Sequence, residues 1–200
     1  MDRAIRCALT LALLAGGAAL AQDEGHEGHH GMEMDPMMQA WMASMHPGPQ
    51  HEMLAGLAGT WNAEITMWMG PGAEPMEAGG TIESEMLFGG RVLRESHGGS
   101  MMDQPFEGLG FTGYDNNTGR YWSVWMDNMG TGVYASEGSY DEESGKLTFE
   151  GDWPGPGGTT MHVKMVGWSD GPDTRRFEMW TTMDEETYQS LDATYTRAGE

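Results

Sequence analysis

The stretch from Phe106 to Gly132 constrains the fold of this 200-residue chain more than any other part of it. Two runs with side chains of alternating character, residues 106–114 and 121–126, flank the turn sequence Asp-Asn-Asn-Thr-Gly at positions 115–119. A period of two is typical of β-strands. In turns, Asp and Asn side chains bond their own backbone, and glycine tolerates positive φ. The stretch is therefore predicted to form a long aromatic β-hairpin.

Short alternating runs continue on both sides of this hairpin. Further strands are predicted at about 61–69, 76–88, 91–97, 131–140, 146–152, 160–168, 174–182 and 187–197. The turn sequence also occurs twice, because Tyr114–Arg120 (YDNNTGR) resembles Tyr140–Lys146 (YDEESGK), and this repetition favours consecutive hairpins. The fold class predicted is all-β: an up-and-down antiparallel barrel of roughly ten strands, with one or two short N-terminal helices.

The first 21 residues have the features of a signal peptide. Arg3 and Arg6 precede the apolar run Cys7–Leu20, and Ala19–Ala21 is a small-x-small cleavage site. We expect cleavage near Ala21 and export to a periplasm or beyond. The apolar run is shorter than the ~20 residues that a transmembrane helix needs, and no later segment approaches that length, so no membrane span is expected.

Cysteine content and charge exclude several classes of function. Cys7 is the only cysteine, so the mature chain would have no disulfide and no thiol chemistry. The formal net charge is −21, and cleavage removes Asp2, Arg3 and Arg6, which leaves −22. Such a chain repels nucleic acid. The spread of the acids along the chain favours a solvated acidic surface, and a dedicated cation-binding surface is the alternative. Nothing in the sequence indicates an oligomeric state.

The mature N-terminus differs in composition from the rest of the chain. Residues 22–36 form a leader rich in His, Met and acids, residues 37–58 are predicted to form short helices, and residues 59–198 the barrel. Imidazole and thioether groups suit copper and other soft metals, so His26, His29 and His30 are candidate metal ligands. The alternative is a mobile acidic leader, followed by an amphipathic helix that starts at Asp35-Pro36 and covers the domain with Met37, Met38, Trp41, Met42 and Met45.

Several motifs resemble the bacterial domain of unknown function family 1579. They are PGPQH at 47–51, LAGLAGTW at 54–61, FEG at 106–108 with GYD at 113–115, WMDNMGTG at 125–132 and ATYTR at 193–197. The resemblance covers about Met37 to Arg197. It implies a lipocalin-like β-barrel, and it implies no activity because the family has no established one.

The segment Gly59-Thr60-Trp61 also resembles the glycine-x-tryptophan that opens the first strand of lipocalins and their relatives. In such barrels an arginine of the last strand packs over the tryptophan, and Arg197 is placed to do so with its cation on the indole face. Haem-binding relatives carry an iron-ligating histidine close to the C-terminus. The last histidine here is His162, so haem is not expected, and His97 or His162 would have to supply any ligand.

No nucleophile motif, phosphate loop or fixed metal triad occurs in the chain. The leading hypothesis is that the barrel binds or carries a small apolar ligand, because such sites are concave and aromatic. The candidate ligand-binding residues are Phe111, Trp122, Trp125, Asp127, Asn128, Tyr134, His97 and Trp180. Under a structural interpretation, Asp127 and Asn128 cap their own turn, and His97 is a hydrogen-bonded or surface residue.

Two alternative functions use other residues or other chemistry. Copper or other soft-metal handling would depend on the N-terminal leader. Hydrolase or isomerase chemistry at the barrel mouth would use a carboxylate with a histidine as general acid and base. Binding is favoured over catalysis, since no spacing brings such a pair together. Which face of each central strand points inward is left open by the sequence, because both faces carry aromatic residues and glycines.

Overall fold

The computed structural model describes residues 34–199, so the predicted signal peptide and His26, His29 and His30 lie outside the described part of the chain. Two helices come first, α1 (Pro36–Ser44) and α2 (Pro49–Ala55). The strands are β1 (Gly59–Met67), β2 (Met76–Leu87), β3 (Val92–Met101), β4 (Gln104–Asp115), β5 (Arg120–Asp127), β6 (Tyr134–Asp141), β7 (Lys146–Pro154), β8 (Thr160–Ser169), β9 (Thr174–Met183) and β10 (Glu186–Arg197). A short 3-10 helix, η1 (Pro156–Gly158), joins β7 to β8.

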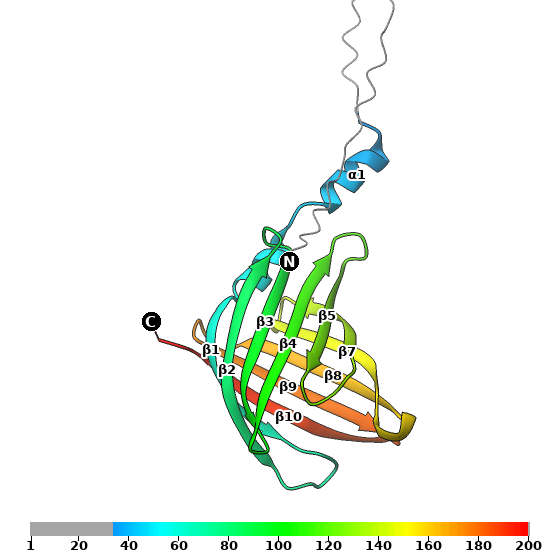
Figure 1. Ribbon diagram of the computed structural model, residues 1–200. Helices are drawn as coiled ribbons and strands as arrows, with labels where there is room; N and C mark the ends of the chain where they lie inside the picture. Colours follow the sequence, from blue (N-terminus) through cyan, green and yellow to red (C-terminus); the bar gives the residue numbers. More distant parts are fainter. Residues whose placement is uncertain (1–33, 200) are drawn as a thin grey trace, which may run out of the picture. The chain divides into compact units, whose positions relative to one another are not determined.

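The strands form a closed antiparallel barrel in which each strand pairs with its neighbours in the sequence, and β1 completes the ring by pairing with β10 (Figure 1). This arrangement confirms the predicted ten-stranded up-and-down barrel. The predicted strand limits differ from the observed ones by a few residues. The largest difference is in β3, which continues to Met101 beyond the predicted end at His97, because Gly98 and Gly99 provide no side chains that would show the alternation.

The repeated turn sequence forms the same turn twice. Between β4 and β5, the Gly119 N–H donates to the Asp115 carbonyl oxygen at 2.8 Å; between β6 and β7, the Gly145 N–H donates to the Asp141 carbonyl oxygen at 2.8 Å. Both glycines have a φ of 68°. In each turn the aspartate side chain accepts a hydrogen bond from the backbone N–H two residues later, which is the Asx-turn chemistry that the sequence indicates.

The register shows which face of each strand points inward. Directly paired residues lie on the same face of a sheet. Trp61 pairs with Ile82, Ile82 with His97, His97 with Gly108 and Gly108 with Asp127. Trp61 and Ile82 are each 1% exposed, so this row of residues faces the interior. Every second residue from this row on each strand is therefore an interior residue, except that the irregularity between Gln189 and Leu191 shifts this alternation by one residue in β10.

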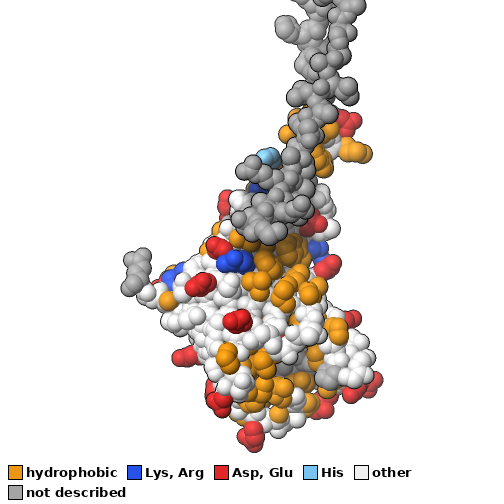
Figure 2. Space-filling model, viewed as in Figure 1, with side chains coloured by type: hydrophobic (Ala, Val, Ile, Leu, Met, Phe, Trp, Pro, Cys, Tyr) orange, Lys and Arg blue, Asp and Glu red, His pale blue; other side chains and the backbone are white. Residues whose placement is uncertain are grey.

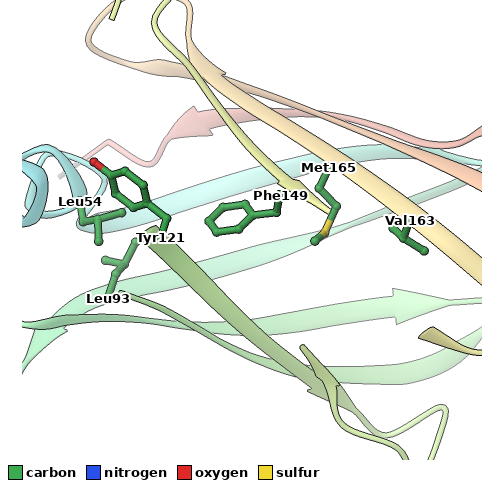
Figure 3. Close-up of a cluster of buried hydrophobic side chains, with 6 residues drawn as sticks. All are labelled: Leu54, Leu93, Tyr121, Phe149, Val163 and Met165. Atoms are coloured by element: carbon green, nitrogen blue, oxygen red, sulfur yellow. The ribbon is translucent and has the colours of Figure 1, made fainter. Parts of the chain in front are cut away.

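Helix α2 covers one end of the barrel, which we call the helix end. Leu54 of α2 is completely buried and packs in a cluster with Leu93, Tyr121, Phe149 and the β8 residues Val163 and Met165. Figure 3 shows this cluster running from Leu54 and Tyr121 past Phe149 to Met165 and Val163. A second cluster contains Trp61, Ala63, Ile82, Ala193 and Tyr195. Together, these clusters fill the interior from the helix end inward.

Helix α1 forms where the sequence predicts a helix, but its apolar face does not cover the domain. None of its residues is buried, and Met38, Trp41 and Met42 are between 43% and 58% exposed. The chain after α1 is instead held by polar contacts, in which Arg91 donates to the Met45 carbonyl oxygen at 2.6 Å and Asn116 donates to those of Ser44 and His46.

No helix in residues 34–199 has the length and apolar character needed to cross a bilayer.

Candidate functional site: the distal half of the barrel

The end of the barrel opposite to α2, which we call the distal end, is formed by the loops at 68–75, 102–103, 128–133, 155–159 and 184–185. Several interior residues near this end are partly exposed, although Met67, Ser136, Val163 and Thr181 in the same half of the barrel are buried. The interior-facing residues of intermediate exposure there are Met76, Met101, Phe106, Trp125, Tyr134, Trp153, Met161 and Met183. Inward side chains of a closed barrel remain accessible only if solvent reaches the interior. Solvent therefore reaches these side chains at the distal mouth of the barrel.

Four aromatic residues on adjacent strands lie along the interior face of this half. Phe106 and Trp125 stack with ring centroids 6.4 Å apart. Trp125 is the direct cross-strand partner of Tyr134, and the Tyr134 ring lies 4.8 Å from that of Trp153. We call Phe106, Trp125, Tyr134 and Trp153 the aromatic strip. It extends over β4, β5, β6 and β7, so the up-and-down order of the strands brings these residues together.

The central ring of the strip, Trp125, is held in place from two sides. Its indole Nε1 donates to Asp127 Oδ2 at 2.7 Å, and the other carboxylate oxygen of Asp127 accepts from the Met129 N–H at 3.0 Å. Below the ring lie Gly108 and Gly110. A Cβ atom on Gly108 would come within 2.5 Å of the indole, so only glycine leaves room for the ring in this position. Asp127 therefore positions Trp125 and also caps its own turn.

His97 lies against the edge of Trp125, with the ring centroids 4.8 Å apart and the rings perpendicular. No hydrogen bond joins its imidazole to another described residue, so both ring nitrogens remain available to a molecule in the interior. Burial lowers the pKa of His97, the Glu95 carboxylate opposes that shift, and the Arg175 guanidinium adds to it. The imidazole is therefore neutral at pH 7, with one donor and one acceptor nitrogen.

An ion pair lies deeper in the interior, between the aromatic strip and the core of the helix end. Arg175 Nη2 is 3.0 Å from Glu95 Oε1, and the two side chains are only 12% and 18% exposed. Glu95 also accepts from Ser84 Oγ at 3.2 Å. Burial raises the pKa of Glu95, but the Arg175 guanidinium and His97 outweigh it, so the net shift is downward. The pair therefore carries no net charge at pH 7, and its groups already have partners.

Trp61 is enclosed by two cations at the helix end. The Arg197 Cζ atom lies 4.2 Å from the centroid of the Trp61 ring, and Arg175 Cζ lies 5.1 Å from it. Arg197 Nη1 also donates to the Ala58 carbonyl oxygen at 3.2 Å, and Trp61 Nε1 donates to that of Leu57 at 3.1 Å. Gly59 has a φ of +129°, and a Cβ atom there would meet Arg197. These contacts join the first strand to the last and have a structural role.

The structure brings some of the predicted ligand-binding residues together and separates others. Trp125, Asp127, Tyr134 and His97 belong to the interior face of the distal half. Phe111, Trp122 and Trp180 occupy the opposite, outer face, since they pair with Arg94, Glu137 and Lys164 respectively.

Asn128 also has a structural position. Its side chain joins β4 to the end of β5, because it accepts from the Glu107 N–H at 3.1 Å and donates to the Pro105 carbonyl oxygen at 3.0 Å. Both ends of its amide are therefore used in holding the two strands together.

Sequence reasoning missed Phe106, Trp153 and Arg175 as site residues. One signal was available for Arg175, because it begins an alternating set with Phe177 and Met179, and a cation on an apolar strand face usually has a buried partner. For Phe106 and Trp153, only the register distinguishes the inner face from the outer one.

Two shallow depressions on the barrel surface do not coincide with the aromatic strip. One is lined mainly by outward-facing residues of β2–β5, such as Glu83, Leu109 and Met126. The other is lined mainly by outward-facing residues of β5–β8. Within residues 34–199, no three His, Asp or Glu side chains gather in a way that would hold a metal ion. The distal interior is therefore the strongest candidate site of the described chain.

The chain belongs to the protein family of unknown function DUF1579, whose model matches residues 46–197. No curated protein matches the sequence. Two solved structures are similar in fold. Rv2717c from M. tuberculosis has a TM-score of 0.60 and 15% identity, with coverage of 77% of this chain and all of that one. An S-type phycobiliprotein lyase from Guillardia theta has a TM-score of 0.56 and 12% identity, with coverage of 77% and 99%. At these identities the similarity establishes the fold only.

Proposed function

We propose that this protein is exported and binds a small, mostly apolar ligand in the distal half of its barrel. The observation that carries the proposal is the aromatic strip, which faces the interior and stays accessible to solvent. Aromatic side chains on an inner face that solvent reaches are the usual lining of a small-molecule site. A phycobiliprotein lyase with a similar fold supports the general idea that such a barrel handles a small organic molecule.

His97 is the proposed polar anchor of the ligand. Its imidazole has no hydrogen bond to a described residue, whereas both oxygens of Asp127 and the Glu95–Arg175 pair already have partners. A neutral imidazole can donate to or accept from one polar group of a bound molecule. A site with one adaptable polar group among aromatic rings fixes the orientation of a ligand that is otherwise apolar.

Two other hypotheses receive less support. General acid–base chemistry would need His97 to share a proton with a free carboxylate, and the nearby carboxylates are engaged elsewhere.

Copper binding by His26, His29 and His30 concerns residues outside the described chain and stays a prediction. Calorimetry with copper on the protein and on a variant with all three histidines replaced by alanine tests it, and equal binding would remove these residues from consideration.

The fluorescent probe N-phenyl-1-naphthylamine tests the ligand site, because it is uncharged and brightens in apolar surroundings. We expect it to bind the wild-type protein, and to bind Trp125→Leu at least about tenfold more weakly, since the central ring of the strip is lost. Trp180→Leu is the matched control, because Trp180 lies on the outer face, and it should bind as the wild type does. Equal affinity of both variants, or no binding to the wild type, would contradict the proposal.

Export is tested separately by locating the protein in fractions of the producing cells. We expect the mature chain outside the cytoplasm, with an N-terminus near Gln22 by mass spectrometry. Full-length protein that stays in the cytoplasm would refute the signal-peptide assignment without affecting the binding site.

A further inference from the structure

We propose that the distal half of the barrel selects a small organic cation with an apolar body, such as a quaternary or protonated amine. This inference rests on the proposed binding function and adds the charge of the ligand. Two independent features carry it, namely the distribution of charge along the barrel axis and the faces of the aromatic strip.

Positive charge is confined to the helix-end half of the barrel, with one exception. Of the ten Lys and Arg residues, Arg3 and Arg6 precede the described chain. Seven of the other eight lie in strand segments or turns near the helix end: Arg91, Arg94, Arg120, Lys146, Arg175, Arg176 and Arg197. The eighth, Lys164, points outward from the middle of β8 and lies 3.6 Å from Glu150. Among the described residues, the distal end therefore carries no basic side chain of the Lys or Arg type.

The distal end carries acids and one histidine, His162, whose Nδ1 lies 2.9 Å from Asp152 Oδ1, whereas acids and bases are mixed at the helix end. The acidic residues of its loops and strand ends are Glu74, Glu77, Asp103, Asp127, Asp152, Asp184, Glu185 and Glu186. Figure 2 shows the same asymmetry on the visible face, where blue groups lie toward the helix end and the lower right edge has red and orange groups. A molecule that enters from the distal end passes through a negative potential, which attracts cations and repels anions.

The aromatic strip provides the second feature. The faces of Trp, Tyr and Phe rings carry partial negative charge, and a cation within about 6 Å of a ring centroid is attracted to them, most strongly over Trp. Two of the four rings of the strip are indoles. No interior guanidinium competes for these rings, because Arg175 lies beside Glu95 and stacks on Trp61 and Tyr195 instead. The neutral imidazole of His97 adds no repulsion at pH 7.

A pair of isosteric probes separates charge from shape. Phenyltrimethylammonium and tert-butylbenzene have the same size, and only the first is charged; benzenesulfonate serves as an anion. We expect calorimetry to show that the cation binds about tenfold more tightly than its uncharged isostere at about 0.01 M salt, and that this preference shrinks at about 0.15 M. Benzenesulfonate should not bind.

Charge variants test whether the distal acids provide the selectivity. Asp184→Asn with Glu185→Gln and Glu186→Gln removes three charges at the distal end, and asparagine tolerates the positive φ of Asp184. Asp170→Asn with Glu142→Gln and Glu143→Gln removes three exposed charges at the helix end and is the matched control. The first variant should lose about half or more of the cation preference, and the control should keep it.

The outcomes distinguish this inference from the proposed function. Equal or tighter binding of tert-butylbenzene, or an equal effect of the two charge variants, overturns the cation preference and leaves the ligand site standing. If none of these probes binds, and N-phenyl-1-naphthylamine does not bind either, both the ligand site and its cation preference are overturned. Cation binding that disappears in Trp125→Leu and persists in Trp180→Leu supports both the ligand site and its cation preference.

Discussion

Replacing Gly108 by alanine should displace Trp125 and damage the proposed site without touching any polar group. The new Cβ atom would lie 2.5 Å from Cη2 and 2.6 Å from Cζ2 of the indole. Carbon atoms in contact prefer about 3.5 to 4.0 Å, so the ring must retreat by about 1 Å. Such a movement would take the 2.7 Å bond between Trp125 and Asp127 to the limit of hydrogen bonding.

The expected cost is about 1 to 3 kcal/mol of the free energy of unfolding, the usual range for overpacking. Urea denaturation followed by tryptophan fluorescence measures it. Binding of N-phenyl-1-naphthylamine to Gly108→Ala should weaken by about tenfold, because the central ring no longer occupies its position.

Gly110→Ala is the matched control, since its Cβ atom would lie 3.4 Å from the same ring, much closer to ordinary contact. Neither glycine has a positive φ, so alanine fits the backbone at both positions and by itself stabilises by about 0.4 to 1 kcal/mol. If the two variants had the same free energy of unfolding and the same affinity for the probe, the argument that Gly108 makes room for Trp125 would be refuted.

Three further predictions concern the interior charges. Glu95→Gln leaves Arg175 buried without its anion and should cost about 3 kcal/mol in denaturant unfolding, whereas replacing both residues by apolar ones should recover part of that loss. Because the pKa values of Glu95 and His97 are both lowered on folding, their contributions to stability are complete above the ordinary values of 4.5 and 6.5 and are lost as the pH falls below them. The free energy of unfolding should therefore fall between about pH 7 and 5, and less so in His97→Gln; an unchanged pH profile in that variant would exclude His97 as the cause. Arg197→Met removes the cation over Trp61 and a hydrogen bond between the chain ends, so the protein should lose about 1 to 2 kcal/mol; unaltered thermal unfolding would show that the contact adds nothing.

The sequence by itself determined the barrel. Ten runs that alternate with a period of two and are separated by turn residues indicate strands, and short turns between them favour an up-and-down order in which each strand pairs with its neighbours in the sequence. The repeated turns at Tyr114–Arg120 and Tyr140–Lys146 follow from local chemistry, since the aspartate and glycine of each turn act on residues a few positions away. Local interactions of this kind are readable without knowledge of the fold.

The tertiary structure alone decided which residues form the site. Trp122 and Trp125 are equally aromatic and three positions apart, yet one faces outward and the other inward, because a strand reverses its side every residue and glycines on both faces hide the pattern. Arg175 and Glu95 are eighty positions apart, and only the closure of the barrel places them 3.0 Å from each other. The distribution of charge between the two ends is also a property of the closed barrel, since the acids and bases alternate along the chain and separate only when the strands stand side by side.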